Sequence, residues 1–253
     1  MNKIYLYDGS FKSLLTLILH LIKFDYIPIN INSEYEYEPN LIDEPVYINV
    51  KEECKELDKL KKIILPSIYL RIYYVYLSNN KNKEMIIYKF IENYLKYRED
   101  IIYRRNIESV NDLIKISKYV GSEAHKLKGF LRFKKMKDFY YAEIDPTNNV
   151  ISILANHFKK RLSNEYWIIS DTKRCIYALY DKKKITYLKK EEILKLNLEL
   201  DNDELFFEKL WKEFFNTIGI KERKNLKCQK NFMPKKYWKN IIEMENVYER
   251  SNK

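Results

Sequence analysis

The chain has 253 residues but only 4 glycines and 6 prolines, so it is long enough to bury an ordinary core and has few positions for long flexible linkers. It carries a formal net charge of +11 and is 15% aromatic, a pairing typical of proteins that follow a nucleic-acid backbone and stack on its bases. Its three cysteines show no CxxC-type spacing, which argues against a zinc knuckle or an iron–sulfur cluster within this chain and favours a reduced compartment.

The first hundred residues are predicted to be mainly helical, with a short strand at their start. The run KIYLY at 3–7 favours a strand, and the apolar periodicity of 11–24 predicts a helix whose first amides are capped by Ser10 or Asp8. The apolar run 14–22 is too short to span a bilayer, so we predict a cytoplasmic protein without membrane contact. The next predicted elements are an acidic loop, a strand and three helices, at 25–45, 46–50, 51–64, 66–78 and 84–98.

A long amphipathic helix followed by a strand is predicted between 110 and 133. Gly121 lies inside this helix, where a glycine costs about 1 kcal/mol relative to alanine, so we expect close approach of another backbone or of a ligand there. Taken with the rest of the chain, a packing contact is the favoured interpretation of Gly121. Gly129 is expected just past the last helical turn. That turn is basic, which suits the carbonyl end of the helix dipole, and contains His125, Lys126 and Lys128.

The C-terminal part alternates short β-rich runs with amphipathic segments. A hairpin of 131–133 with 139–144, a helix at 150–162 and three antiparallel strands give the order ββαβββ; the three strands are 167–170, 175–180 and 185–188. A final helix carries an apolar stripe from Leu205 to Ile218 that we expect to be core, and it ends at Gly219.

The predicted fold class is therefore α+β. A mainly helical N-terminal part, 1–109, would pack on a basic C-terminal part, 110–253, which holds an antiparallel sheet and terminal helices, with both parts in one integrated domain.

The positive charge is confined to the C-terminal part. Residues 1–100 hold 14 Lys and Arg against 15 Asp and Glu, whereas 101–253 hold the remaining 33 against 21. An AT-rich genome also produces abundant lysine, but it should make both parts basic alike, so the uneven distribution favours contact with a polyanion. The predicted backbone-binding cations are Lys126, Lys128, Arg132, Lys160, Arg161, Arg174, Arg223 and Lys224, with Tyr237 and Trp238 available for stacking. Arg132, Arg161 and Arg223 are favoured because arginine suits bidentate phosphate contacts.

A catalytic interpretation rests on four residues. His125 and His157 lie on the two helices that flank the hairpin, and Asp145 and Asp171 lie in turns between elements. If they converge, they supply a general acid–base pair or part of a metal site. Short diagnostic ligand spacing is absent, so we predict no metal and no cofactor.

Several separated strings resemble those of a known family. They are YDGSF at 7–11, EAHKLKGFLRF at 123–133, DPTNNV at 145–150, HFKKR in the helix ending near 161, SDTKR at 170–174, LWKEFFNTIGIKERKN at 210–225 and QKNFMPKKYW at 229–238. Together they are similar to an uncharacterised bacterial family described as a probable DNA-metabolism protein. The resemblance implies a gene neighbour encoding a radical-SAM protein of DNA modification or repair, and a relation to domains fused to uracil-DNA-glycosylase-like domains. It implies no catalytic activity, and this chain contains neither a radical-SAM cysteine triplet nor a glycosylase module.

Three functions therefore stay open. The first is a DNA-binding accessory protein in DNA repair or modification that acts with a radical-SAM partner. The second is a DNA-processing enzyme, glycosylase-like or nuclease-like, that uses His125 and His157. The third is a protein–protein scaffold whose basic face is incidental. The sequence leaves open whether the protein is an enzyme.

Overall fold

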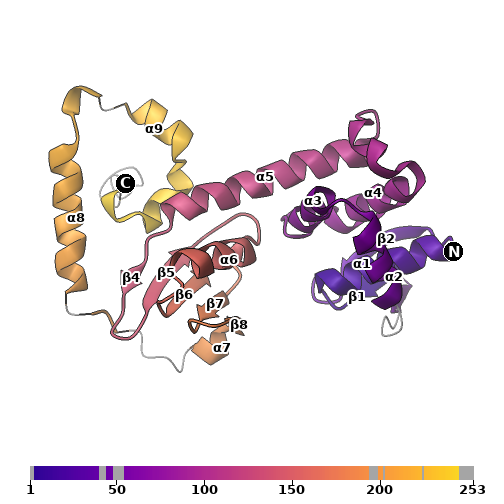
Figure 1. Cartoon of the computed structure of the whole chain (residues 1–253), viewed down its shortest axis with the longest axis horizontal. Helices are drawn as coiled ribbons and strands as arrows, with labels where there is room; N and C mark the ends of the chain where they lie inside the picture. Colours follow the sequence, from indigo (N-terminus) through magenta and orange to yellow (C-terminus); the bar gives the residue numbers. More distant parts are fainter. Residues whose placement is uncertain are drawn as a thin grey trace. The chain divides into compact units, whose positions relative to one another are not determined.

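The computed structural model describes residues 3–39, 44–47, 54–193, 199–201, 203–223 and 225–244. The chain forms two compact units, 1–121 and 122–253 (Figure 1). One long helix, α5 (Glu108–Phe130), contributes its first part to the first unit and its last turns to the second. The fold class is α+β, as the sequence predicts.

The first unit contains a small parallel sheet with strand order β2-β1-β3. Its strands are β1 (Lys3–Tyr7), β2 (Pro28–Ser33) and β3 (Pro45–Tyr47), and α1 (Phe11–Lys23) connects β1 to β2. The Ser10 hydroxyl caps α1 by accepting a hydrogen bond from the Ser13 N–H at 3.2 Å, as predicted. β2 lies inside the predicted loop 25–45, and that prediction was wrong. Pairing with β1, which no local pattern encodes, makes the Asn-rich segment PININS a strand.

Helices complete the first unit. They are α2 (Cys54–Ile63), α3 (Pro66–Tyr76) and α4 (Lys83–Tyr97), close to the predicted ranges, followed by a 3₁₀ turn at Arg98–Tyr103 that was not predicted. Apolar side chains of α1, α3 and α4 form the core, with Leu14, Ile72 and Phe90 fully buried. A Cβ on Gly121 would lie 3.1 Å from the Tyr74 ring, so this glycine makes the expected packing contact, but with a side chain instead of the expected backbone or ligand.

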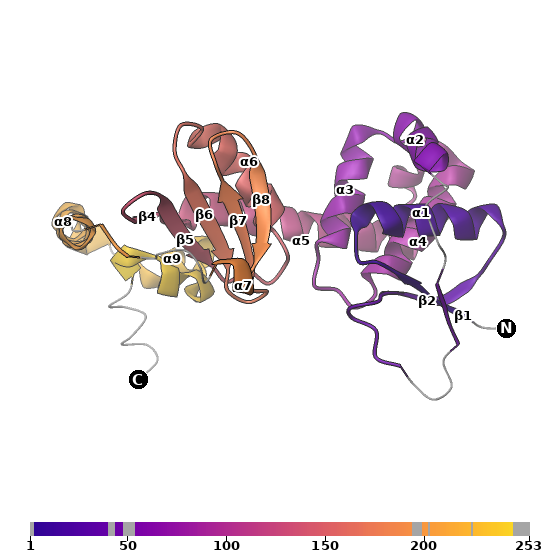
Figure 2. The same ribbon diagram turned by 90° about the horizontal axis from the view of Figure 1, so that it is seen from below.

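The second unit is built on a five-stranded sheet with order β4-β5-β6-β7-β8. Its strands are β4 (Lys134–Lys135), β5 (Tyr140–Ile144), β6 (Trp167–Asp171), β7 (Ile176–Tyr180) and β8 (Ile185–Lys189), and α6 (Ile151–Arg161) packs on one face of the sheet (Figure 2). The order ββαβββ is confirmed. The sheet is mixed, however, because β5 and β6 run parallel. The prediction of an all-antiparallel sheet was wrong, since a helical crossover returns the chain in the same direction.

The first strand of this sheet also differs from the prediction. α5 continues to Phe130, so Gly129 lies within its last turn instead of after it. β4 accordingly begins at Lys134 rather than at 131.

Short helices end the second unit. They are α7 (Lys190–Ile193), α8 (Glu204–Ile218), α9 (Leu226–Phe232) and 3₁₀ turns at Lys221–Arg223, Lys235–Asn240 and Ile242–Met244. Gly219 is the C-cap of α8, as predicted. The apolar stripe of α8 was expected to be core, yet none of its residues is buried. Periodicity shows that a helix is amphipathic but not which surface covers it.

Candidate functional site

The turn at 145–148 is held by residues from distant parts of the second unit. Glu123, buried on α5, accepts hydrogen bonds from the N–H groups of Thr147 at 3.0 Å and Asn148 at 2.8 Å. The same carboxylate accepts a hydrogen bond from Lys236 Nζ at 2.6 Å. Burial acts to raise the pKa of Glu123, but these hydrogen bonds outweigh it and lower the pKa. Three of the distinctive strings thus meet at one turn.

A second anchor reaches the same turn from the end of β6. The Arg174 guanidinium donates hydrogen bonds to the carbonyls of Pro146 and Thr147 and pairs with Asp171 at 3.0 Å. Asp171 is fully buried and also accepts the N–H groups of residues 173 and 174. Burial raises the pKa of Asp171 against the opposing effect of Arg174. Arg174 therefore stabilises the fold, and its positive charge is paired with the carboxylate of Asp171.

The four candidate catalytic residues occupy different settings. Asp145 directly follows β5, and Asp171 ends the neighbouring strand β6, where it pairs in register with Ile144. Asp145 contacts Lys239 Nζ at 2.6 Å, so each carboxylate has a cationic partner. His125 is exposed on α5, and His157 is half-buried on α6. Among the described residues, no three His, Cys, Asp or Glu side chains are grouped so as to hold a metal ion.

Other predicted contacts of the nucleic-acid backbone also have partners within the protein. Arg132 pairs with Glu243 at 2.8 Å and donates a hydrogen bond to the Gly129 carbonyl at 2.9 Å. Trp238 is 1% exposed, and its indole N–H donates to the Met233 carbonyl at 2.8 Å.

The other predicted nucleic-acid-binding residues differ in how far they are exposed. Tyr237 is 5% exposed, so neither it nor Trp238 presents a ring face for a base to stack on. Arg223 is exposed on the turn after α8. Lys224 lies outside the described residues, and Lys126 is half-buried on α5.

One group of cations gathers at the C-terminal ends of α5 and α6. Lys128 and Arg161 lie close enough to His157 that their charges, after burial, lower its pKa. Lys160 lies beside Arg161 in the last turn of α6. Within the described ranges no carboxylate forms an ion pair with Lys128, Lys160 or Arg161.

The turn between β7 and β8 extends this group. Lys182 Nζ lies 4.4 Å from the ring centre of Tyr166, in the segment that follows α6, and Lys159 Nζ lies 5.9 Å from the ring of Tyr180 on β7. Tyr180 in turn donates a hydrogen bond to the Ser163 carbonyl at 3.3 Å. We call the combined surface the basic patch; its residues are Lys128, His157, Lys159, Lys160, Arg161, Tyr166, Lys182, Lys183 and Lys184.

Sequence reasoning found Lys128, His157, Lys160 and Arg161 but missed the rest of the basic patch. The consecutive lysines 182–184 were visible in the sequence as a turn, although nothing local connected that turn with α6. Lys182 has φ 68°, a left-handed conformation that glycine or asparagine adopts more readily. Backbone strain of this kind is often retained where a side chain has a function.

Comparison with known proteins gives one family. The model of a family described as a domain of unknown function, DUF4130, matches residues 81–243, a range that contains every residue of the basic patch. No curated protein matches the chain. In the part of the chain that the structure describes, every helix is too short or too polar to cross a bilayer.

Proposed function

We propose that this chain, which belongs to the family of the domain of unknown function DUF4130, binds the phosphate backbone of DNA through its basic patch. The observation that carries the proposal is the difference between two sets of cations. Arg132, Arg174, Lys236 and Lys239 contact carboxylates of the protein itself. The basic patch instead has seven lysine and arginine side chains, and the chain segments that carry them, 125–130, 157–166 and 181–184, contain two acidic residues, Glu165 and Asp181.

The carboxylate of Asp181 is already used locally. It accepts hydrogen bonds from the N–H groups of Lys183 at 2.9 Å and Lys184 at 2.7 Å, which fixes the turn and lowers the pKa of Asp181. The basic patch therefore carries excess positive charge. Binding of this charge to phosphates is favourable because it releases the counterions condensed on the nucleic acid.

The patch also offers an aromatic ring. Tyr166 is 48% exposed, and the ammonium group of Lys182 lies over one side of its ring. An exposed tyrosine ring beside basic side chains supplies a platform for an unstacked base, which would favour single-stranded or distorted DNA over regular duplex.

The resemblance to a probable DNA-metabolism family adds a partner to this proposal. We propose that the chain acts as an accessory protein, holding DNA for a radical-SAM enzyme of repair or modification. In this role the chemistry belongs to the partner, and the basic patch supplies affinity without sequence preference.

A titration of labelled single-stranded and duplex DNA, followed by fluorescence anisotropy at about 50 mM and about 200 mM salt, tests the proposal. We expect affinity to fall steeply with salt, and the double variant Lys160→Glu/Arg161→Glu to bind about tenfold more weakly or worse with a shallower salt dependence. The matched control is Lys61→Glu/Lys62→Glu, which reverses two exposed lysines of α2 in the first unit and should bind as the wild type does.

Two results would overturn the proposal. One is the absence of binding even at low salt, which leaves the scaffold function as the better description. The other is equal weakening by the α2 control, which would mean that net charge rather than the basic patch determines binding.

One observation favours a DNA-processing enzyme as a second candidate. Burial, Lys128 and Arg161 lower the pKa of His157 from its usual value, which keeps the imidazole neutral near pH 7, the form that a general base requires. Incubation with uracil-containing, alkylated and UV-damaged DNA, with and without divalent metal, tests this function. Cleavage or base release that is lost in His157→Gln and His125→Gln would support it, and activity that survives both substitutions would exclude these residues as the catalytic pair.

A further inference from the structure

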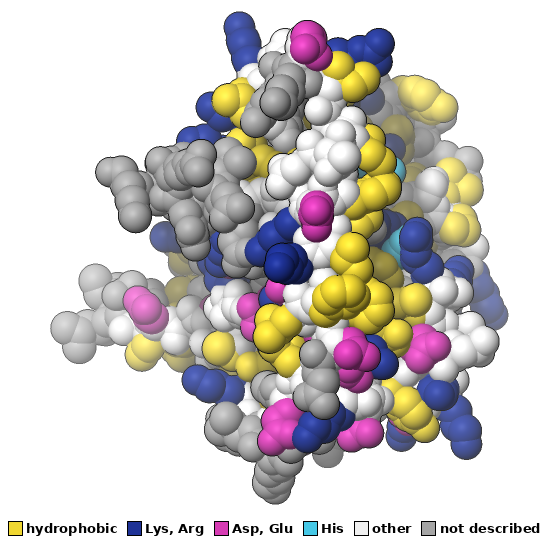
Figure 3. All heavy atoms as spheres, turned by 90° about the vertical axis from the view of Figure 1, so that its left-hand side faces the viewer, with side chains coloured by type: hydrophobic (Ala, Val, Ile, Leu, Met, Phe, Trp, Pro, Cys, Tyr) yellow, Lys and Arg dark blue, Asp and Glu magenta, His cyan; other side chains and the backbone are white. Residues whose placement is uncertain are grey.

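The helix α8 presents an apolar side that the other described residues cover only in part. Its large apolar side chains are between 41% and 66% exposed; they are Leu205, Phe206, Phe207, Leu210, Trp211, Phe214, Phe215 and Ile218. Figure 3 shows hydrophobic side chains in a band on the side of the molecule where α8 lies.

Polar contacts keep α8 attached to the rest of the second unit. Glu208 pairs with Lys134 at 2.9 Å, and Glu204 accepts a hydrogen bond from the Lys135 N–H at 2.9 Å. Farther along, the Trp211 indole donates to Glu243 at 3.1 Å. These three polar contacts therefore hold α8 in position.

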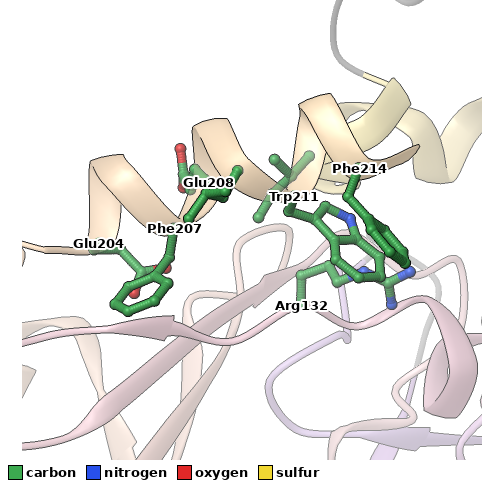
Figure 4. Close-up of a pocket in the computed structure, with 8 residues that line it drawn as sticks. Arg132, Glu204, Phe207, Glu208, Trp211 and Phe214 are labelled. Atoms are coloured by element: carbon green, nitrogen blue, oxygen red, sulfur yellow. The ribbon is translucent and has the colours of Figure 1, made fainter. Parts of the chain in front are cut away.

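A pocket of about 800 Å³ lies beneath the apolar side. Its lining comes from α8 on one side, with Glu204, Phe207, Glu208, Leu210, Trp211 and Phe214, and from Arg132 and Ile242 on the other. Figure 4 shows Trp211 and Phe214 of α8 beside Arg132, with Phe207 farther along the helix near Glu204.

The exposed apolar area of α8 exceeds the largest apolar patch of a typical monomer. Seven of the eight side chains lie on one side of the helix, and with about half of each exposed they present roughly 700 Å² of apolar surface, taking ~200 Å² for a large side chain. The largest patch on a typical monomer is about 300–600 Å², whereas a stable protein–protein interface buries about 800 Å² on each partner. The area thus matches one half of a dimer interface.

The spacing of this side is self-complementary. Phe207, Trp211, Phe214 and Ile218 follow one another at intervals of four, three and four residues, the spacing of a coiled-coil seam. When two such helices run antiparallel about a two-fold axis between 211 and 214, Phe207 of one copy meets Ile218 of the other. Trp211 of one copy likewise meets Phe214 of the other. The two-fold axis repeats each of these two contacts, so the interface has four layers of side chains.

The charges on α8 argue against a membrane surface or a polyanion as the partner of its apolar side. A helix that lies on an anionic membrane needs lysine and arginine along its polar side, but α8 carries Glu204, Glu208 and Glu213 against Lys209 and Lys212. The same balance gives a polyanion no advantage, and an apolar seam offers nothing to phosphate.

We propose that the chain is a homodimer in which α8 of each copy packs antiparallel against α8 of the other and fills the pocket beneath it. The dimer goes beyond DNA binding and does not depend on it, because the basic patch and α8 share no residue. It places two basic patches in one particle related by a two-fold axis.

Sedimentation velocity of the full chain at micromolar concentration tests the dimer. We expect the wild type to sediment as a dimer, and Phe207→Glu and Ile218→Lys each to sediment as monomers, because each places two unpaired charges in the seam. An equimolar mixture of the two variants should regain a dimer, since antiparallel pairing brings Glu at 207 of one chain to Lys at 218 of the other. Leu205→Glu, on the opposite side of α8, is the matched control and should remain dimeric.

Each outcome decides the matter. A wild type that is monomeric at every concentration, or a Phe207→Glu variant that stays dimeric, overturns the proposal. So does a mixture that remains monomeric while far-UV circular dichroism shows that both variants are folded, because recovery on mixing requires the antiparallel register.

Discussion

Glu123 and Lys236 lie 113 residues apart in the sequence, yet the lysine Nζ contacts the buried carboxylate at 2.6 Å. This contact joins the last turns of α5 to the 3₁₀ turn that carries the buried Trp238. The pair therefore closes the second unit around its sheet.

Replacement of this carboxylate should destabilise the second unit. Glu123→Gln keeps the side-chain volume but removes the charge and leaves an amide N–H₂ against the donors of Thr147, Asn148 and Lys236. We expect a loss of roughly 2 kcal/mol, typical of a buried group whose hydrogen-bond partners are left unsatisfied. Urea unfolding followed by tryptophan fluorescence measures it. Glu165→Gln, on the surface, should unfold as the wild type does.

The same group predicts how stability responds to acid. The pKa of Glu123 is lower in the folded chain than its ordinary value of 4.5, because its hydrogen bonds outweigh the effect of burial. Its contribution is therefore fully present above about pH 4.5 and is lost as the pH falls through the lower, folded pKa. Below that range Glu123→Gln and the wild type should converge in stability; a difference that stays constant with pH would contradict the assignment.

Glu84 in the first unit should behave in the opposite way. Burial raises its pKa, even though Lys83 and the Tyr7 hydroxyl, which donates to it at 3.0 Å, act to lower it. A carboxyl group with a raised folded pKa stabilises the fold below the unfolded value and loses that contribution as the pH rises through the folded pKa. Glu84→Gln, which can still accept the tyrosine hydrogen bond, should remove this loss, which begins as the pH rises above about 4.5.

The two units can be observed separately, because all three tryptophans, Trp167, Trp211 and Trp238, belong to the second. Far-UV circular dichroism reports both units and should register the effect of Glu84→Gln. Tryptophan fluorescence should not, and an equal change in both signals would contradict the prediction.

Arg174 should prove structural rather than DNA-binding. Arg174→Ala leaves Asp171 buried without its cation, so we expect a loss of about 3 kcal/mol in stability. At temperatures where the variant is folded, its affinity for DNA and its salt dependence should be unchanged. Its neighbour Lys173 is exposed, and Lys173→Ala should affect stability little. A folded Arg174→Ala protein with a shallower salt dependence would return this residue to the binding surface.

The two glycines of α5 should respond differently to alanine. A Cβ on Gly129 meets nothing within 4 Å, so Gly129→Ala should stabilise the helix by about 0.5–1 kcal/mol. At Gly121 the added carbon would lie 3.1 Å from the Tyr74 ring, which must move to accommodate it. Gly121→Ala should therefore gain clearly less than Gly129→Ala in urea unfolding followed by circular dichroism, and an equal gain would mean that the ring yields freely.

The sequence predicted what local patterns encode. The strands 167–171, 176–180 and 185–189 and the helix 151–161 were found because alternation and helical periodicity lie within each segment. The direction of β5 relative to β6 and the existence of β2 depend on pairing with distant strands, so local pattern missed both.

In the candidate site, too, the sequence predicted local features and missed those that depend on long-range contacts. Lys160 and Arg161 were predicted as exposed cations on a helix end, and they lie there. Arg174 was wrongly grouped with these exposed cations. Its partners, the carbonyls of Pro146 and Thr147, are 28 and 27 residues away, so the local sequence pattern does not reveal them. An arginine in a turn looks the same in sequence whether it contacts phosphate or its own backbone.

The contact between Glu123 and Lys236 also has a consequence for how the chain folds during synthesis. The strands β4 to β8 pair with near neighbours and can assemble as they leave the ribosome, but Glu123 receives its lysine only when most of the chain has been made. Until then the turn at 145–148 lacks one of its anchors. We expect slowed translation or truncation before 236 to yield a second unit with a formed sheet but an unfinished, protease-sensitive edge.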